Sequence, residues 1–266
     1  MLYSVNNTQL NVLELGRGSR TLVFLHYFGG SALEWQTVMN QFADQYRCLA
    51  VDLRGHGDSA APATGYSVET MADDVVELLT VLTVDTFVLI GHSLSGKVAL
   101  EVASRQPTGL QSLVLVSPSP PKPEPISDAD RKDMLDTHGQ RSAAEKTLAK
   151  ITAKPLSEMA KEQIIADNLR TSKTAWDAWL TLGSKEDITD HMKTVQVPIA
   201  IVAGTDDKAI APDVQPELTL PYLQNATFDT IDAAGHLLPW EIPDELTTFI
   251  RQHIVPAIPS DPTHKI

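Results

Sequence analysis

The sequence predicts an open, doubly wound α/β fold in which a mostly parallel sheet of eight strands carries an inserted helical cap. Continuous apolar runs of strand length are the first observation, because strands buried on both faces of a parallel sheet lack an alternating pattern. Amphipathic helical patterns between these runs are the second. The third is that this alternation stops once, over residues 119–194. The runs are Leu22–Leu25, Cys48–Val51, Phe87–Ile90, Leu113–Val116 and Ile199–Val202.

Two further strands are predicted ahead of these runs, over Leu2–Val5 and Gln9–Leu15. Asn6 and Asn7 lie between them. Asparagine tolerates the left-handed backbone of a two-residue hairpin turn, so the pair predicts a tight hairpin at the start of the chain.

Helical spacing is clearest over residues 71–82, where Ser67 or Thr70 can serve as the N-cap. The last predicted strand covers Ala226–Ile231. A final helix is predicted from Pro243, since proline is favoured in the first helical turn.

Residues 119–194 predict helices and no strand. A proline-dense stretch, residues 118–125, cannot continue either kind of element. Ser142–Glu145 has the spacing of a capping box. Two apolar stripes follow, one made of Leu156, Met159, Ala160 and Ile164 and the other of Trp176, Trp179 and Leu180.

These patterns divide the chain into an α/β core, residues 1–118 and 195–266, and a helical cap, residues 119–194. The cap is expected to lie over the carboxyl ends of the strands, where ligands bind in open α/β sheets. The end of the chain, Val255–Ile266, contains three prolines and is predicted to be irregular.

Composition excludes several classes of protein. The chain has 266 residues, a net charge of −13 and no basic face for nucleic acid or an anionic membrane. No apolar run is long enough to span a membrane, and no secretory signal is visible. Cys48, the only cysteine, lies in an apolar run and is predicted to be core. These features predict a cytoplasmic protein; they make no prediction of its oligomeric state.

The apolar run Phe87–Ile90 ends abruptly at Gly91, and Ser93 follows within two residues, just before a helical pattern. A buried strand turning sharply into a helix, with serine at the turn, is typical of the Gly-x-Ser-x-Gly nucleophile elbow. Ser95 stands where that pattern has its second glycine. Ser95 is small enough for close packing, and its hydroxyl is expected to bond to nearby backbone.

Two other strand ends carry residues that a serine nucleophile needs. Asp206 and Asp207 follow the run Ile199–Val202, and His236 follows the last strand. Acyl transfer by serine requires a base to take its proton and an acid to orient that base. The order Ser, Asp, His along the chain is typical of α/β-hydrolases, unlike the orders in chymotrypsin and subtilisin.

Over essentially its full length the chain resembles the α/β-hydrolase superfamily. Five stretches carry the resemblance, each at a predicted strand end: Leu25–Ser31, Asp52–Ser59, Gly91–Gly96, Gly204–Asp207 and Gly235–Glu241. The resemblance implies Ser93 as nucleophile, His236 as general base and Asp207 as the acid that orients it. Asp206 is the competing acid, and the motif spacing favours Asp207.

The resemblance also implies an oxyanion hole made of the backbone amides of Phe28 and Leu94. The family's usual His-Gly-x-Gly-Gly run is altered here, because Tyr27 replaces the first glycine. Two interpretations stay open. The Tyr27 ring packs against the lid, or its hydroxyl faces the substrate pocket.

Trp176, Trp179 and Trp240 are candidates for the lining of that pocket, although packing is the favoured interpretation of Trp176 and Trp179 and explains Trp240 equally well. His26, His56 and His92 are not spaced like metal ligands, and no glycine pattern for a phosphate or a dinucleotide is present. We therefore expect no cofactor and no metal.

The sequence thus predicts a cofactor-free serine hydrolase that cleaves small-molecule carboxylic esters or lactones through an acyl-enzyme. Within the same fold, a perhydrolase of the haloperoxidase type or a carbon–carbon bond hydrolase is the alternative. Epoxide hydrolases and haloalkane dehalogenases need aspartate at the elbow, so Ser93 disfavours both. A non-catalytic small-molecule receptor is the alternative of another class, since fold does not fix function.

Overall fold

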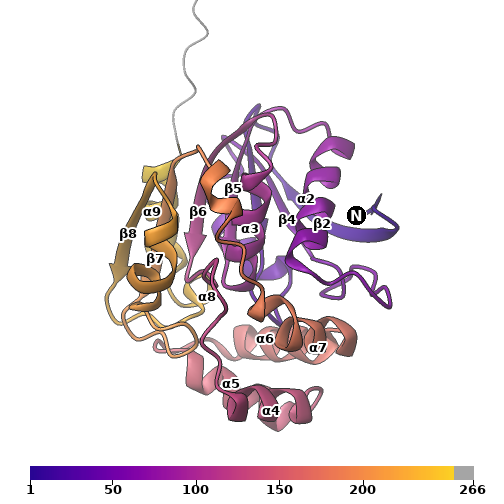
Figure 1. Ribbon diagram of the computed structural model, residues 1–266, viewed down its shortest axis with the longest axis vertical. Helices are drawn as coiled ribbons and strands as arrows, with labels where there is room; N and C mark the ends of the chain where they lie inside the picture. Colours follow the sequence, from indigo (N-terminus) through magenta and orange to yellow (C-terminus); the bar gives the residue numbers. More distant parts are fainter. Residues whose placement is uncertain (255–266) are drawn as a thin grey trace, which may run out of the picture.

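The structure is a computed structural model that describes residues 1–254, and the predicted irregular tail lies outside the described residues. Its centre is one eight-stranded sheet with the order β1-β2-β4-β3-β5-β6-β7-β8 (Figure 1). Strand β2 runs antiparallel to both of its neighbours and the other pairs are parallel, so the predicted mostly parallel doubly wound sheet is confirmed. The strands are β1 (Leu2–Val5), β2 (Thr8–Leu15), β3 (Thr21–Leu25), β4 (Arg47–Val51), β5 (Phe87–His92), β6 (Leu110–Val116), β7 (Ile199–Gly204) and β8 (Ala226–Ile231).

The hairpin between β1 and β2 turns at the two predicted asparagines. Asn6 has a φ of 38° and Asn7 a φ of 61°, both in the left-handed region. Two successive left-handed residues match the right-handed twist of the strands they join. The predicted hairpin is therefore confirmed.

Helices cover both faces of the sheet, which explains why its strands are apolar on both sides. On one face, α2 (Val68–Val81) and α3 (Leu94–Ser104) pack on Val23 and Leu25 of β3. On the other face, α1 (Gln36–Asn40), α8 (Leu238–Glu241) and α9 (Pro243–His253) pack on Leu22 and Phe24. Cys48 is fully buried in this second layer, as predicted.

Four helices lie between β6 and β7 and gather beyond one end of the sheet (Figure 1). They are α4 (Asp128–Thr137), α5 (Arg141–Ile151), α6 (Glu158–Arg170) and α7 (Lys173–Thr181). Two details differ from the sequence prediction. Helix α5 begins at Arg141 with Gln140 as its N-cap and without a side-chain cap bond, so Ser142 lies inside the first turn and forms no capping box.

The predicted apolar stripe on α6 is wrong at Met159, although Ile164 is buried and Leu156 packs on the same apolar cluster, as predicted. Met159 is 83% exposed, and the buried positions are Ile164, Ile165 and Asp167. Ser157 caps α6 by accepting the Ala160 amide, which fixes the rotation of the helix and turns Met159 outward.

An ion-pair chain holds α6 on the core. Arg170 pairs with Asp58 at 2.6 Å, and also with Asp167 at 2.7 Å. Asp167 in turn accepts the Ser31 hydroxyl at 2.8 Å. Ser31 follows β3 and Asp58 follows β4, so one helix of the insertion is fastened to the loops after two neighbouring strands.

A buried lysine joins both ends of the insertion to the core. Lys97 of α3 is fully buried, and its Nζ donates to the carbonyl oxygens of Lys122, at 2.9 Å, and Glu186, at 2.8 Å. Lys122 lies on the segment that leaves the core and Glu186 on the segment that returns to it. Both ends of the insertion are therefore fixed to the helix that begins at the candidate nucleophile.

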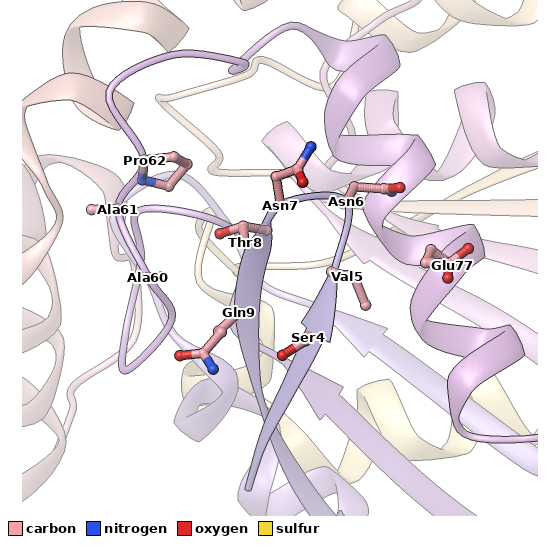
Figure 2. Close-up of a pocket in the computed structure, with 10 residues that line it drawn as sticks. All are labelled: Ser4, Val5, Asn6, Asn7, Thr8, Gln9, Ala60, Ala61, Pro62 and Glu77. Carbon is pink, nitrogen blue, oxygen red and sulfur yellow. The ribbon is translucent and has the colours of Figure 1, made fainter.

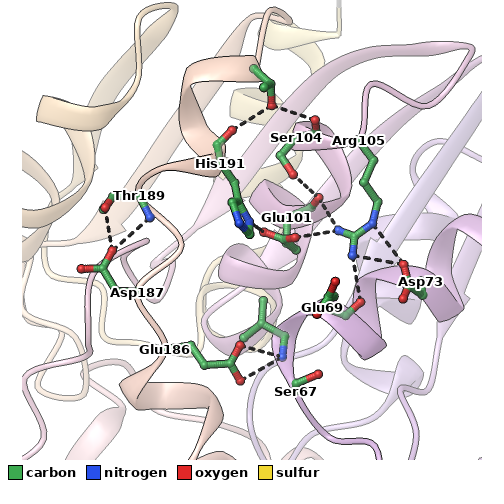
Figure 3. A network of polar contacts seen from close by, with 12 residues as sticks. Ser67, Glu69, Asp73, Glu101, Ser104, Arg105, Glu186, Asp187, Thr189 and His191 are labelled. Carbon is green, nitrogen blue, oxygen red and sulfur yellow. Dashed lines mark hydrogen bonds and ion pairs between the residues drawn. The ribbon is translucent and has the colours of Figure 1, made fainter.

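The returning segment has further polar contacts with α2 and α3 (Figure 3). The Glu186 carboxylate accepts the Val68 amide at the start of α2. Farther along, His191 Nδ1 lies 2.8 Å from Glu101 of α3, which also pairs with Arg105 at 2.9 Å. No helix among residues 1–254 combines the length and the apolar character that crossing a membrane requires.

Candidate active site

Ser93 occupies a tight turn between β5 and α3. Its φ of 55° and ψ of −119° lie outside the regions that a non-glycine residue normally adopts. A Cβ on Gly91 would come within 2.5 Å of the Ser95 carbonyl oxygen, and one on Gly96 within 2.3 Å of the Pro118 Cβ. Both positions therefore require glycine, Gly91 because strand and helix approach closely there and Gly96 because Pro118, in the segment after β6, lies against it.

Ser95 fills the second glycine position of the elbow pattern without strain. It is fully buried, and its hydroxyl donates to the carbonyl oxygen of His26 in the loop after β3. The expected bond from this hydroxyl to the backbone is thus confirmed. It joins the elbow directly to the loop that carries Tyr27 and Phe28.

His236 and Asp207 meet at the carboxyl ends of β8 and β7. His236 Nδ1 lies 2.7 Å from Asp207 Oδ2, and both side chains are almost completely buried. The other oxygen, Asp207 Oδ1, accepts the amides of Ala209 and Ile210 at 2.8 and 3.0 Å. Asp206 is exposed to solvent, so the geometry pairs the histidine with Asp207, the residue favoured by the spacing.

The two groups shift each other's pKa in opposite directions. Burial raises the pKa of Asp207, but the facing His236 and the hydrogen bonds from His236 and Ile210 outweigh burial and bring the pKa below its ordinary value. Burial lowers the pKa of His236, and the Asp207 carboxylate more than reverses this, so the pKa lies above 6.5. Asp207 is therefore ionised near neutral pH.

Glu241 holds the loop that carries His236, a role that no sequence pattern predicts. Its Oε2 accepts the amides of Gly235, Ala153 and Lys154 at 3.1, 2.8 and 2.8 Å, and its Oε1 accepts the Leu237 amide at 3.1 Å. One carboxylate thus ties the histidine loop to the segment that follows α5.

The amide of His236 itself donates to the Ile151 carbonyl, the last residue of α5, at 2.7 Å. The ring hydrogen bonds of His236 are confined to Nδ1 within residues 1–254. The position of the histidine therefore depends on both the core and the insertion, through bonds that leave Nε2 for proton exchange.

The two predicted oxyanion donors lie at the ends of adjacent strands. Phe28 follows β3 and Leu94 follows β5, which pair in parallel. Within the described part of the chain, neither amide donates a hydrogen bond to another residue. Two unpaired N–H groups at one sheet edge are the feature that an oxyanion hole requires, and that role stays a prediction.

Tyr27 replaces glycine in that loop without a strained backbone, since it is not among the described residues with positive φ. Its ring is buried and packs with side chains from α5 and α6, among them Leu148 and Ile164. The packing interpretation is therefore supported by the apolar cluster that contains the Tyr27 ring. A hydroxyl turned to the substrate remains a prediction.

His26 and His56, two of the three motif histidines, form hydrogen bonds with the protein backbone. His26 Nδ1 lies 2.8 Å from the Tyr27 carbonyl and its Nε2 accepts the Leu53 amide at 3.0 Å. His56 Nδ1 lies 3.1 Å from the Arg54 carbonyl. Burial lowers the pKa of His26 to about 4 and that of His56 to about 3, so both are neutral.

Among the predicted pocket residues, two tryptophans of α7 lie against Phe28 in the loop after β3. The ring centroids of Trp176 and Trp179 are 4.3 and 6.4 Å from that of Phe28. Trp240 is partly buried and packs on the cluster that contains Tyr27. The insertion therefore contacts the loop that carries the Phe28 amide, while a direct contact with substrate stays a prediction.

Two surface grooves lie away from these residues. One, of about 610 Å³, lies beside the β1–β2 hairpin and is lined by Ser4 to Gln9, Ala60 to Pro62 and Glu77 (Figure 2). The other, of about 500 Å³, lies between α5 and α6. Neither includes Ser93, Asp207 or His236. These three residues are no more than 6% exposed.

A model of the alpha/beta hydrolase family matches residues 22–248. The chain belongs to this family. This alpha/beta hydrolase is 30% identical over 243 residues to a non-heme chloroperoxidase of Streptomyces lividans, an alignment that covers 83% of this chain and 86% of the relative. The resemblance that the motifs indicate is thus confirmed.

Solved structures share the fold of this alpha/beta hydrolase. An esterase from Exiguobacterium antarcticum has a TM-score of 0.87 at 20% identity, covering 94% of this chain and 97% of that one. An enol-lactonase from Burkholderia xenovorans LB400 has a TM-score of 0.81 at 21% identity, covering 95% and 98%. At these identities the likeness shows the common fold alone.

The Glu241 hydrogen bonds predict a specific defect. Replacing Glu241 with Gln places an NH₂ group against amide donors and removes a charged acceptor, so we expect a loss of about 1–3 kcal/mol in the free energy of unfolding. Urea unfolding measures this loss. Glu245→Gln, an exposed glutamate on α9, is the matched control and should leave stability within about 0.5 kcal/mol. Equal stability of the two variants would contradict the role given to Glu241.

Proposed function

We propose that this alpha/beta hydrolase is a serine hydrolase that cleaves carboxylic esters or lactones through an acyl-enzyme, without a cofactor or metal. The observation that carries the proposal is the buried bond of 2.7 Å between His236 Nδ1 and Asp207 Oδ2. The strained turn at Ser93 adds to this observation. A nucleophile, a base and an acid are then present at the ends of three strands along one edge of the sheet.

In the proposed reaction, Ser93 Oγ attacks the carbonyl carbon of the ester while His236 Nε2 takes its proton. Asp207 holds the Nδ1–H of the ring and stabilises the imidazolium that forms. The amides of Phe28 and Leu94 bind the oxyanion. His236 then gives the proton to the leaving alcohol, and the acyl group stays on Ser93.

The second half of the reaction reverses the roles. His236 removes a proton from water, the resulting hydroxide attacks the acyl carbon, and the proton returns to Ser93 as the carboxylic acid leaves. Each oxyanion donor is typically worth about 3 kcal/mol of transition-state stabilisation. Two donors would together supply about 6 kcal/mol, against the roughly 8 kcal/mol that the smallest typical enzymatic rate enhancements require.

We also propose that residues 119–194 form a cap over this site, on a core made of residues 1–118 and 195–266. The low exposure of Ser93 supports this, because substrate must then pass the insertion to reach the hydroxyl. Trp176, Trp179, Trp240 and Tyr27 are the proposed lining. Their rings would place the acyl or alcohol group in an apolar pocket.

One observation favours a second candidate, perhydrolysis. The Streptomyces lividans relative is named a non-heme chloroperoxidase. In a perhydrolase the same acyl-enzyme would form, and hydrogen peroxide would replace water as the acceptor. The products would be a peroxycarboxylic acid and free Ser93, with His236 moving the proton as before.

Hydrolysis of a short activated ester tests the proposal. We expect Ser93→Ala to lower kcat by at least about 10⁴-fold, because the nucleophile is lost. Ser104→Ala, on the same helix and away from the site, is the control and should keep full activity. Absence of Ser93-dependent turnover would indicate a non-catalytic binding protein. Ser93-dependent peroxycarboxylic acid formation that outpaces hydrolysis would establish the perhydrolase.

The pH dependence provides a second test. Only neutral His236 accepts a proton, and its pKa lies above 6.5, so kcat/KM should fall about tenfold per pH unit below that pKa. Asp207→Asn removes the charge that raises this pKa. The acid limb should therefore move to lower pH, while kcat falls by about 10⁴-fold. An acid limb that Asp207→Asn leaves unmoved would contradict the assignment.

A further inference from the structure

Three loops of the proposed site are joined by one chain of side-chain hydrogen bonds. Glu34 Oε2 accepts the Tyr27 amide at 3.3 Å, and Glu34 Oε1 lies 3.1 Å from His92 Nδ1. His92 Nε2 lies 2.9 Å from the carbonyl oxygen of His236. Tyr27 is the residue before Phe28, and His92 is the residue before Ser93. These hydrogen bonds therefore reach the residue next to the proposed oxyanion donor, the residue next to the proposed nucleophile, and the backbone of His236.

The two backbone groups at the ends of this chain fix where its protons are. A carbonyl can only accept, so His92 Nε2 carries a hydrogen and donates it to His236. If the ring is neutral, Nδ1 then has no hydrogen and must accept one from Glu34. The alternative is a charged imidazolium facing a Glu34 carboxylate. Both states hold the same number of protons.

Burial favours the neutral state. Glu34 is 2% exposed, and its only donor among the described residues, apart from His92, is the Tyr27 amide. Asp207, which is ionised, has two amide donors in addition to His236. A buried carboxylate with a single amide donor is poorly stabilised.

The neighbouring charges act in the same direction. The negative charge of Asp167 opposes a second negative charge on Glu34. Burial first, and then Asp167, raise the pKa of Glu34 well above its ordinary value. Burial, and next the charge on His236, hold the pKa of His92 well below 6.5.

A neutral His92 also suits the proposed reaction. The rings of His92 and His236 have centroids 5.0 Å apart. A positive charge on His92 would oppose the imidazolium that forms on His236 when Ser93 attacks. The neighbour of the catalytic base must therefore bind its carbonyl without carrying charge.

We propose that Glu34 is a positioning residue that acts as a neutral carboxylic acid, donating its O–H to His92 Nδ1 and thereby fixing the tautomer that holds the His236 carbonyl. The chain Tyr27–Glu34–His92–His236 sets the relative position of the oxyanion loop, the elbow and the histidine loop. This inference rests on the proposed serine-hydrolase function.

The test compares two substitutions of Glu34. In Glu34→Gln the carboxamide NH₂ donates to His92 and its oxygen accepts the Tyr27 amide, so we expect kcat to stay within about threefold of wild type. Glu34→Met keeps the length but removes both bonds, and a shift of about 1 Å in the histidine loop can lower kcat about 100-fold. KM should change less than kcat, since no substrate contact is removed. Equal kcat in both variants, or an equal loss in both, would overturn the proposal.

Glu101 provides the matched control (Figure 3). It is also a buried glutamate beside a histidine, His191, but it pairs in addition with the Arg105 guanidinium. The negative charge of Glu101 is thus stabilised by the Arg105 guanidinium. Glu101→Gln should lower the melting temperature and leave kcat unchanged, whereas Glu34→Gln should leave the melting temperature close to wild type. The reverse order of melting temperatures would contradict a neutral Glu34.

A readout independent of activity separates this inference from the proposed function. ¹⁵N NMR of histidine-labelled protein should show His92 neutral, with hydrogen on Nε2 and none on Nδ1, between about pH 6 and about pH 9. A charged His92, or hydrogen on Nδ1 alone, would overturn the inference. If wild type lacks Ser93-dependent turnover, the proposed function fails while this measurement still decides where the protons of His92 are.

Discussion

The left-handed backbone at Ser93 is the constraint on which the rest of the site depends. A strand that must turn into a helix at one residue, with φ at 55°, brings the two backbones into contact and excludes a Cβ at Gly91, while Pro118 excludes one at Gly96. Its neighbours hold that turn in place. The Ser93 amide donates to Val116, and the Ser93 carbonyl accepts the Ser119 amide at 2.9 Å. Strain of this kind persists only where surrounding bonds over-determine it.

The carboxyl groups around this turn differ in the number of N–H donors that reach them. Asp207 faces His236 and two amides, so its negative charge is stabilised, and Glu241 accepts four amides. Glu34 has one amide donor and lies near Asp167. A carboxyl group with several N–H donors is thus stabilised as the anion, and one with a single donor is not. This difference underlies the proposed roles of Asp207 and Glu34.

Sequence patterns predicted the sheet and the strand-end residues well, because apolar runs and glycines report local backbone geometry. Ser93 and His236 follow directly from glycines next to strands. Glu34, Glu241 and Lys97 were missed because each has a partner far along the chain: Glu34 reaches His92 across 58 positions, Glu241 reaches Ala153 across 88, and Lys97 reaches Glu186 across 89. Ser142 and Met159 were placed wrongly because a helix can start two residues earlier, or rotate, without changing its composition.

The most direct test of Ser93 as the nucleophile is covalent labelling with a fluorophosphonate, followed by peptide mass spectrometry. The expected result is a single adduct on the peptide that contains Ser93, absent in Ser93→Ala and formed much more slowly in Asp207→Asn, because His236 then loses the orientation that activates the hydroxyl. An adduct on another residue, or none on a folded protein, would contradict the assignment of Ser93, His236 and Asp207 as one catalytic unit.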